Sequence, residues 1–239
     1  MAKIIIHRAA SRDQSDFGWL KSAHTFSFGK HYDPERINFG ALRVLNDDWV
    51  SGGQGFGEHP HDNMEIISIP LEGSLQHEDS MGNTAVIEAG EIQVMSAGTG
   101  IYHKEFNKQK NEAVQFLQIW LFPNQRNVTP RYQQLHYEEL LKHNTFTQIL
   151  SPHRDDAGVW IYQDAWFSMG KFDRKTVIDY PLKSEGNGLY IFVLKGHAQA
   201  ESQLLNERDG IGVWETDKVS IEAEAGAQLL LMEVPMNFN

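Results

Sequence analysis

The stretch from Gly53 to Glu65 reads Gly-Gln-Gly-Phe-Gly-Glu-His-Pro-His-Asp-Asn-Met-Glu and contains two histidines, His59 and His61, separated by one residue. Side chains two positions apart on a β-strand point to the same face of the sheet. If this stretch is a strand, both imidazoles therefore project to the same side. On a surface loop the same spacing would have no functional meaning, so the interpretation depends on a second motif.

A second pair with the same spacing, His103 and Glu105, occurs further along the chain. If its strand neighbours the first one in the wall of a barrel, three imidazoles and one carboxylate meet at one interior point. Neutral imidazole and carboxylate groups are suitable ligands for a divalent transition metal, with coordination positions left open. The two motifs together predict a metal site formed by His59, His61, His103 and Glu105.

Short β-type segments separated by turn residues dominate the rest of the chain. Residues 91–95 and 115–120 alternate apolar and polar side chains, as half-buried strands do, and Gly, Asn and Asp gather between such segments. The one convincing helical stretch, residues 137–142, is short. This pattern is typical of an all-β protein, either a sandwich or a barrel.

A weak internal repeat indicates two copies of one β-unit. An apolar strand that ends in Leu-x-Gly occurs at residues 66–73 and again at 189–196. Each copy is followed by a second glycine that opens another strand. We therefore expect two domains, residues 1–130 with both histidine motifs and residues 131–239.

Composition and charge exclude several functional classes. The 239 residues contain 21 Lys and Arg against 32 Asp and Glu, which gives a net charge of −11 at pH 7, and no cysteine. Direct binding to nucleic acid is not expected, because a protein with a net negative charge has no overall electrostatic attraction to a phosphate backbone. Any metal must have nitrogen and oxygen ligands. The isoleucines at 4–6 are too few for a signal peptide, and we expect a cytoplasmic protein with no membrane partner.

These motifs resemble the cupin superfamily and, more narrowly, the bacterial members of the pirin family. The resemblance covers about residues 17–132 and is carried by GWL (18–20), HTFSF (24–28), FGALRV (39–44), HPH (59–61), LEG (71–73), DSMGN (79–83), SAGTGI (96–101) and the pair His103 and Glu105. It implies a bicupin, that is, two stacked jelly-roll barrels of which only the N-terminal one binds metal. The repeat agrees with this, because none of the positions 182, 184 and 188 that correspond to 59, 61 and 65 carries a ligand side chain.

Two carboxylates compete for the fourth ligand position. Cupins in general take it from the first motif, which here is Glu65, whereas pirin-like proteins take it from the second, which here is Glu105. Glu105 shares the face of His103, whereas Glu65 shares the face of His61 only if no bulge intervenes. We favour Glu105 as the ligand and Glu65 as a residue that orients a ligand.

The resemblance implies a quercetin 2,3-dioxygenase, a metal-dependent enzyme that cleaves a flavonol-like substrate with O₂. Chelation would lower the pKa of the substrate hydroxyl, and Glu105 is the expected catalytic general base if it loosens from the metal. Phe116 and Ile119 are candidates to line the pocket. Iron(II) is the favoured metal, and nickel, copper, zinc and manganese stay open.

A different class of function also stays open, namely a metal- or redox-sensing regulatory protein that acts on a protein partner without turning over a flavonol. A cupin with another native reaction is a third interpretation. Among the other histidines, His24 and His31 are predicted to be structural, and the sequence does not indicate which side His77 faces.

Overall fold

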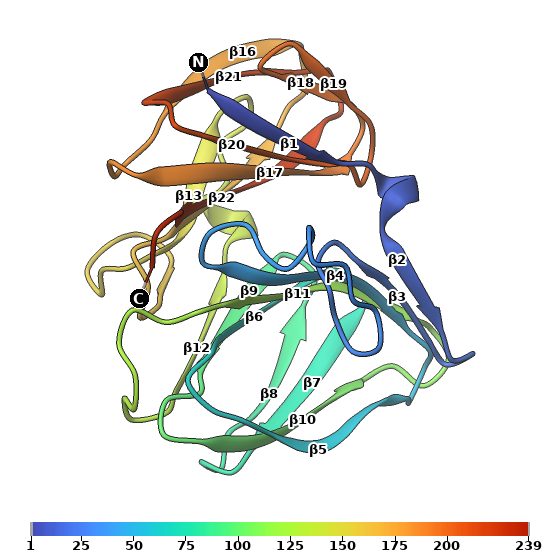
Figure 1. Cartoon of the computed structure of the whole chain (residues 1–239). Helices are drawn as coiled ribbons and strands as arrows, with labels where there is room; N and C mark the ends of the chain where they lie inside the picture. Colours follow the sequence, from blue (N-terminus) through green and yellow to red (C-terminus); the bar gives the residue numbers. More distant parts are fainter. Residues whose placement is uncertain (1, 239) are drawn as a thin grey trace.

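The computed structural model describes residues 2–238 and consists of two β-barrels stacked one on the other (Figure 1), which confirms the predicted all-β bicupin. In the first barrel a seven-stranded sheet faces a four-stranded sheet. The larger sheet contains, in spatial order, β12 (Arg131–His136), β9 (Glu91–Ser96), β6 (Glu65–Glu72), β11 (Val114–Leu121), β4 (Leu42–Val50), β3 (Leu20–His24) and β2 (Asp13–Asp16). The smaller sheet contains β5 (Gly55–His61), β10 (Ile101–Asn107), β7 (Ser74–Asp79) and β8 (Thr84–Glu88).

The second barrel has the same plan of seven and four strands. Its larger sheet contains β1 (Lys3–His7), β20 (Gly210–Trp214), β17 (Asn187–Lys195), β22 (Gln228–Pro235), β15 (Trp166–Lys171), β13 (Phe146–Ser151) and β14 (Val159–Trp160). Its smaller sheet contains β16 (Thr176–Pro181), β21 (Lys218–Ala223), β18 (Ala198–Ala200) and β19 (Gln203–Leu205). The helices of the described chain are two 3₁₀ turns, η1 (Ala9–Ser11) and η2 (Glu138–Leu140). The helix expected over 137–142 is thus a single turn, and neither element has the length and apolar character that crossing a membrane requires.

The strand pairing differs from the expected division of the chain at residue 130. Strand β1 pairs with β20 of the second barrel, and β12 pairs with β9 of the first. Each strand covers the open edge of a sheet, whose backbone groups would otherwise lack partners. The repeat in the sequence could not reveal this, because an edge strand does not have to follow its sheet in sequence.

Alternation along β11 shows how one strand builds both the core and the site. Leu117 and Ile119 point outward from the first barrel into a cluster of buried side chains that also contains Phe167 and Phe192 of the second barrel. The side chains between them point the other way, since successive residues of a strand face opposite sides. The two barrels therefore share one apolar core between their large sheets, and Ile119 lies in it rather than in a pocket.

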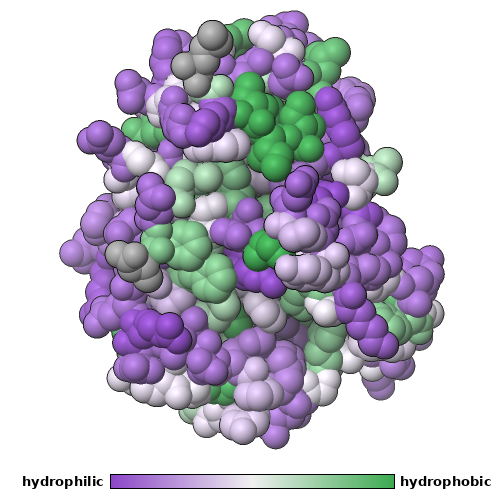
Figure 2. All heavy atoms as spheres, viewed as in Figure 1, coloured by the Kyte–Doolittle hydropathy of each residue, from purple (hydrophilic) through white to green (hydrophobic). Residues whose placement is uncertain are grey.

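The surface seen in Figure 2 is mainly hydrophilic, with hydrophobic side chains gathered over β1 in the second barrel. Ile4 on this strand is 39% exposed. Strand β1 pairs with β20 along one edge and is the last strand of its sheet, so the backbone of its other edge is not paired with any strand of the described residues.

Candidate metal centre

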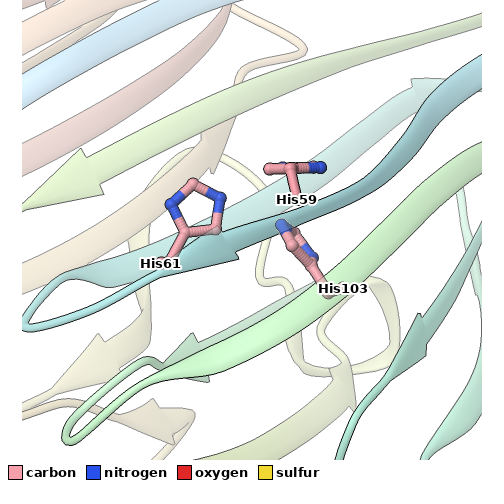
Figure 3. A group of neighbouring side chains, drawn as sticks. All are labelled: His59, His61 and His103. Atoms are coloured by element: carbon pink, nitrogen blue, oxygen red, sulfur yellow. The ribbon is translucent and has the colours of Figure 1, made fainter.

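Strands β5 and β10 bring the three predicted histidines together. They run antiparallel, and their register places His103 directly opposite His59. The ring centroids of His59 and His103 are 4.4 Å apart, and each lies 4.9 Å from the ring of His61 (Figure 3). One nitrogen from each ring lies within 4.8 Å of the other two. His59 and His61, two positions apart on β5, project from the same face of the sheet as His103, which lies opposite His59.

The protonation and hydrogen bonding of these rings fit a metal. Nδ1 of His59 lies 2.7 Å from the carbonyl oxygen of Gly57, to which it can donate, and this leaves Nε2 free. Nε2 of His103 is buried and has no hydrogen-bond partner among the described residues. Burial lowers the pKa of His61 to about 4 and lowers that of His103 as well. Neutral imidazole is the form that binds a metal, so the donor set suits a divalent transition metal.

Glu105 lies on β10 beyond a register shift that separates it from His103. Its carboxylate is 2% exposed and accepts hydrogen bonds from Ser68 Oγ at 3.0 Å and Gln118 Nε2 at 2.7 Å. Burial raises its pKa. One of its oxygens lies within 4.8 Å of ring nitrogens of His103 and of His77, so Glu105 stands beside the three-histidine cluster rather than inside it.

Glu65, the other candidate carboxylate, lies on a different sheet. The chain turns after His61, with Asn63 at a φ of 45°, and Glu65 opens β6 in the large sheet. Its carboxylate accepts a hydrogen bond from Ser96 Oγ at 2.7 Å, and burial raises its pKa to about 7. It does not line the cavity beside the described histidines. The turn, and not a bulge, therefore separates Glu65 from the face of His61.

His77 is the residue that sequence reasoning left unassigned. It is fully buried on β7, where it lies opposite Glu105 of β10. Its Nε2 is 3.0 Å from a carboxylate oxygen of Asp79, and its Nδ1 is 3.5 Å from Nδ1 of His103. A histidine that binds a metal through one nitrogen is usually held by a hydrogen bond at the other. The spacing of His77 and Asp79, again two residues, was the signal that could have found this pair.

A cavity of about 440 Å³ lies beside His59 and His61. Phe28, Phe56 and Trp120 give it aromatic walls. Trp120 packs edge-on against His61, with ring centroids 4.9 Å apart. A volume of this size falls within the range of small-molecule pockets. The cavity therefore has room for a flat aromatic molecule next to the histidine cluster.

Comparisons with known proteins agree with this architecture along the whole chain. Residues 7–121 match the Pirin family model, and residues 148–234 match a model described as the quercetinase C-terminal cupin domain. A quercetin 2,3-dioxygenase of Escherichia coli strain K12 is 38% identical over 232 residues, which cover 97% of this chain and 99% of that protein. This chain belongs to the pirin family.

Other pirin-family relatives are similar over nearly the same length. A pirin-like protein of Caulobacter vibrioides is 36% identical over 220 residues, 92% of this chain and 94% of the relative. The crystal structure of the bacterial pirin YhhW from Escherichia coli in complex with nickel(II) has a TM-score of 0.92 at 36% identity, covering 98% of this chain and 99% of that one. Metal binding thus occurs within the pirin family, and the neutral histidine cluster of this chain is suited to it.

Proposed function

We propose that this pirin-family protein is a metal-dependent dioxygenase that cleaves a flavonol such as quercetin with O₂. The observation that carries the proposal is the cluster of His59, His61 and His103 at a cavity with aromatic walls. The relative named quercetin 2,3-dioxygenase supports it, because the identity extends over both barrels.

His59, His61 and His103 would hold the metal, and Glu105 is the proposed fourth ligand. When bound, the metal would act as a Lewis acid on the substrate hydroxyl and supply the redox chemistry with O₂. We propose iron(II) for this role. Nickel, copper, zinc and manganese also accept imidazole ligands, so metal identity is part of the test.

Glu105 also acts as the general base in this proposal, in the state in which it is not bound to the metal. Its raised pKa, which follows from burial, makes the carboxylate a better proton acceptor than an exposed glutamate. Ser68 and Gln118 each donate to one of its oxygens and so hold the carboxylate in position. When Glu105 takes the hydroxyl proton, the substrate becomes the anion that a metal binds more tightly.

The aromatic walls position the substrate and keep water out. Phe28 packs edge-on against Trp120 with centroids 5.5 Å apart, so the two rings hold each other in place. Flat aromatic molecules gain from offset-stacked and edge-to-face contacts of this kind. These side chains favour a planar polycyclic substrate over a small aliphatic one.

The test is quercetin turnover under O₂ by protein reconstituted with iron, nickel or copper, with carbon monoxide as the detected product. We expect carbon monoxide release from at least one loaded form and none from His103→Ala. Glu105→Gln is expected to lower kcat by at least about 100-fold, as for loss of a general base. A fully loaded site without turnover would contradict the proposal and favour a regulatory role through a protein partner.

A further inference from the structure

A row of polar side chains lines the cavity on the wall opposite β5 and β10. Asp48 of β4 is 4% exposed, and Ser22 of β3, which pairs with it across the strands, donates a hydrogen bond to its carboxylate. Ser22 Oγ also lies 3.3 Å from Nδ1 of His24. All three side chains line the cavity. An acidic group on the cavity wall is therefore joined to a histidine through a hydroxyl.

The row continues from His24 to the surface. Nε2 of His24 is 3.1 Å from Ser15 Oγ, which is 3.3 Å from Nε2 of His31. The side chain of His31 is 35% exposed, and its Nδ1 lies 3.9 Å from a carboxylate oxygen of Asp13. We call this series the polar row; its members are Asp48, Ser22, His24, Ser15 and His31. All five line the cavity, and the row runs without a break from the buried Asp48 to the partly exposed His31.

Every member of the polar row can both donate and accept a proton. Hydroxyls and neutral imidazoles have one donor and at least one acceptor, and a carboxyl group accepts when ionised and donates when protonated. The contacts on His24 use its two ring nitrogens separately, one toward Ser22 and one toward Ser15. Burial lowers the pKa of His24, which keeps this ring neutral and able to accept a proton at one nitrogen while it releases another from the second.

Cleavage of a flavonol with loss of carbon monoxide releases a proton. The carbon that bears the hydroxyl leaves with its oxygen as carbon monoxide, and both of its bonds to neighbouring ring carbons break. The two atoms of O₂ become the carbonyl oxygen of an ester and one oxygen of a carboxylic acid. The hydroxyl proton balances that acid, which is ionised at neutral pH because its pKa is about 4. One proton must therefore leave the buried site in each turnover.

We propose that the polar row is a proton path between the cavity and solvent, an inference that rests on the proposed dioxygenase function. Glu105 on the small sheet, which takes the hydroxyl proton, and Asp48 on the large sheet both line the cavity, and Asp48 is the acid that accepts the proton released into the cavity in each turnover. The proton then moves through Ser22, His24 and Ser15 to His31. These five residues position and transfer a proton, and the bond-breaking chemistry takes place elsewhere in the cavity.

The surroundings of Asp48 and His24 support this role. Burial raises the pKa of Asp48 to about 7, with Ser22 acting in the opposite direction and the charges of Asp47 and Glu105 adding to the rise. An acid with such a pKa both binds and releases a proton near neutral pH. The groups that face His24 are Asn46, His31, Asp13 and Arg12.

The first experiment breaks the row at its half-buried outer link. Ser15→Ala is expected to lower kcat for carbon monoxide release by about tenfold and to raise the solvent isotope effect on kcat, with KM and metal content unchanged. Ser15→Thr keeps the hydroxyl and is expected to restore both values. Ser22→Ala tests the inner link in the same way. Wild-type kcat and isotope effect in both alanine variants would overturn the proposal.

A second experiment does not depend on turnover. The ring nitrogens of His24 are followed by ¹⁵N NMR in metal-free protein from about pH 5 to about pH 9. We expect an inflection near the pKa of Asp48, about 7, that disappears in Asp48→Asn and in Ser22→Ala. An unchanged inflection in Ser22→Ala, or none in the wild type, would refute the path. If no loaded form releases carbon monoxide but the inflection behaves as expected, the dioxygenase proposal fails while the connection from cavity to solvent is upheld.

Discussion

His59 and His103 lie directly opposite each other on antiparallel strands, with ring centroids 4.4 Å apart. The histidine cluster therefore depends on the register of β5 and β10, because the pairing of these two backbones determines which side chains lie opposite each other. A metal bound there would join the two strands of the small sheet.

His103→Ala is expected to abolish metal binding without unfolding the first barrel, because only the two rings of β5 and the proposed ligand Glu105 are left. Metal content, measured by mass spectrometry after reconstitution, should fall from one equivalent to a residual level, with an unchanged circular dichroism spectrum. Tyr102→Ala, on the same strand but 53% exposed, is the matched control and should bind metal normally. Stoichiometric metal in His103→Ala would show that the cluster is not the binding site.

His77→Gln is expected to weaken metal binding by about 10- to 100-fold without abolishing it. The physical reason is that His77, itself held by Asp79, fixes the ring of His103 through its Nδ1. Competition with a chelator gives the dissociation constant. Gln76→Ala, at the adjacent position on β7, serves as the control. Equal metal affinities for the two variants would show that His77 does not support metal binding.

Trp120→Ala is expected to raise KM for quercetin by about tenfold, because it removes an aromatic wall of the cavity. Metal content should stay the same, since the indole offers no ligand. Trp120→Phe retains an aromatic ring beside His61 and should remain within about twofold of the wild type. If KM is unaffected in Trp120→Ala, the substrate does not occupy this cavity.

Glu65→Gln tests the buried carboxyl group through the pH dependence of stability. The folded-state pKa of Glu65 is raised from 4.5 to about 7, so the folded protein holds a proton that the unfolded chain releases. The wild type is therefore fully stabilised below pH 4.5 and loses stability as pH rises through 7. The glutamine variant does not titrate at this position. Its free energy of unfolding should therefore rise by about 3 kcal/mol relative to the wild type between pH 4.5 and pH 7, at about 1.4 kcal/mol per pKa unit. Urea unfolding at several pH values measures the difference, and a constant difference would contradict the raised pKa.

The sequence was sufficient to predict the barrel class and to group His59, His61 and His103, because the period of two along a strand is visible in the residues themselves. It could not place Glu105 beside His77, since that relation depends on which strand lies next to β10. The position of Glu65 could not be predicted from the sequence either. It lies only four positions after His61 in the sequence, yet a turn between them moves it to another sheet.

The polar row was also beyond sequence reasoning. Its members come from β2, β3, β4 and the loop that contains His31, and only the pairing of these strands puts them in line. His24 and His31 were predicted to be structural, because histidines among aromatic residues usually are. The structure agrees that His24 is buried, hydrogen-bonded and packed against Phe28, and it adds that both histidines line the cavity.

The pairing of β1 with β20 has a consequence for how the protein folds. Lys3 lies opposite Trp214, so this contact closes a loop of nearly the whole chain, and contacts of such high sequence separation form late and slowly. During synthesis the segment that contains Ile4 leaves the ribosome well before its partner strand β20 and cannot pair until that strand has been made. Exposed apolar strand edges of this kind promote aggregation until they pair. Removing residues 3–7 should therefore impair the maturation and solubility of the second barrel more than the assembly of the histidine cluster in the first.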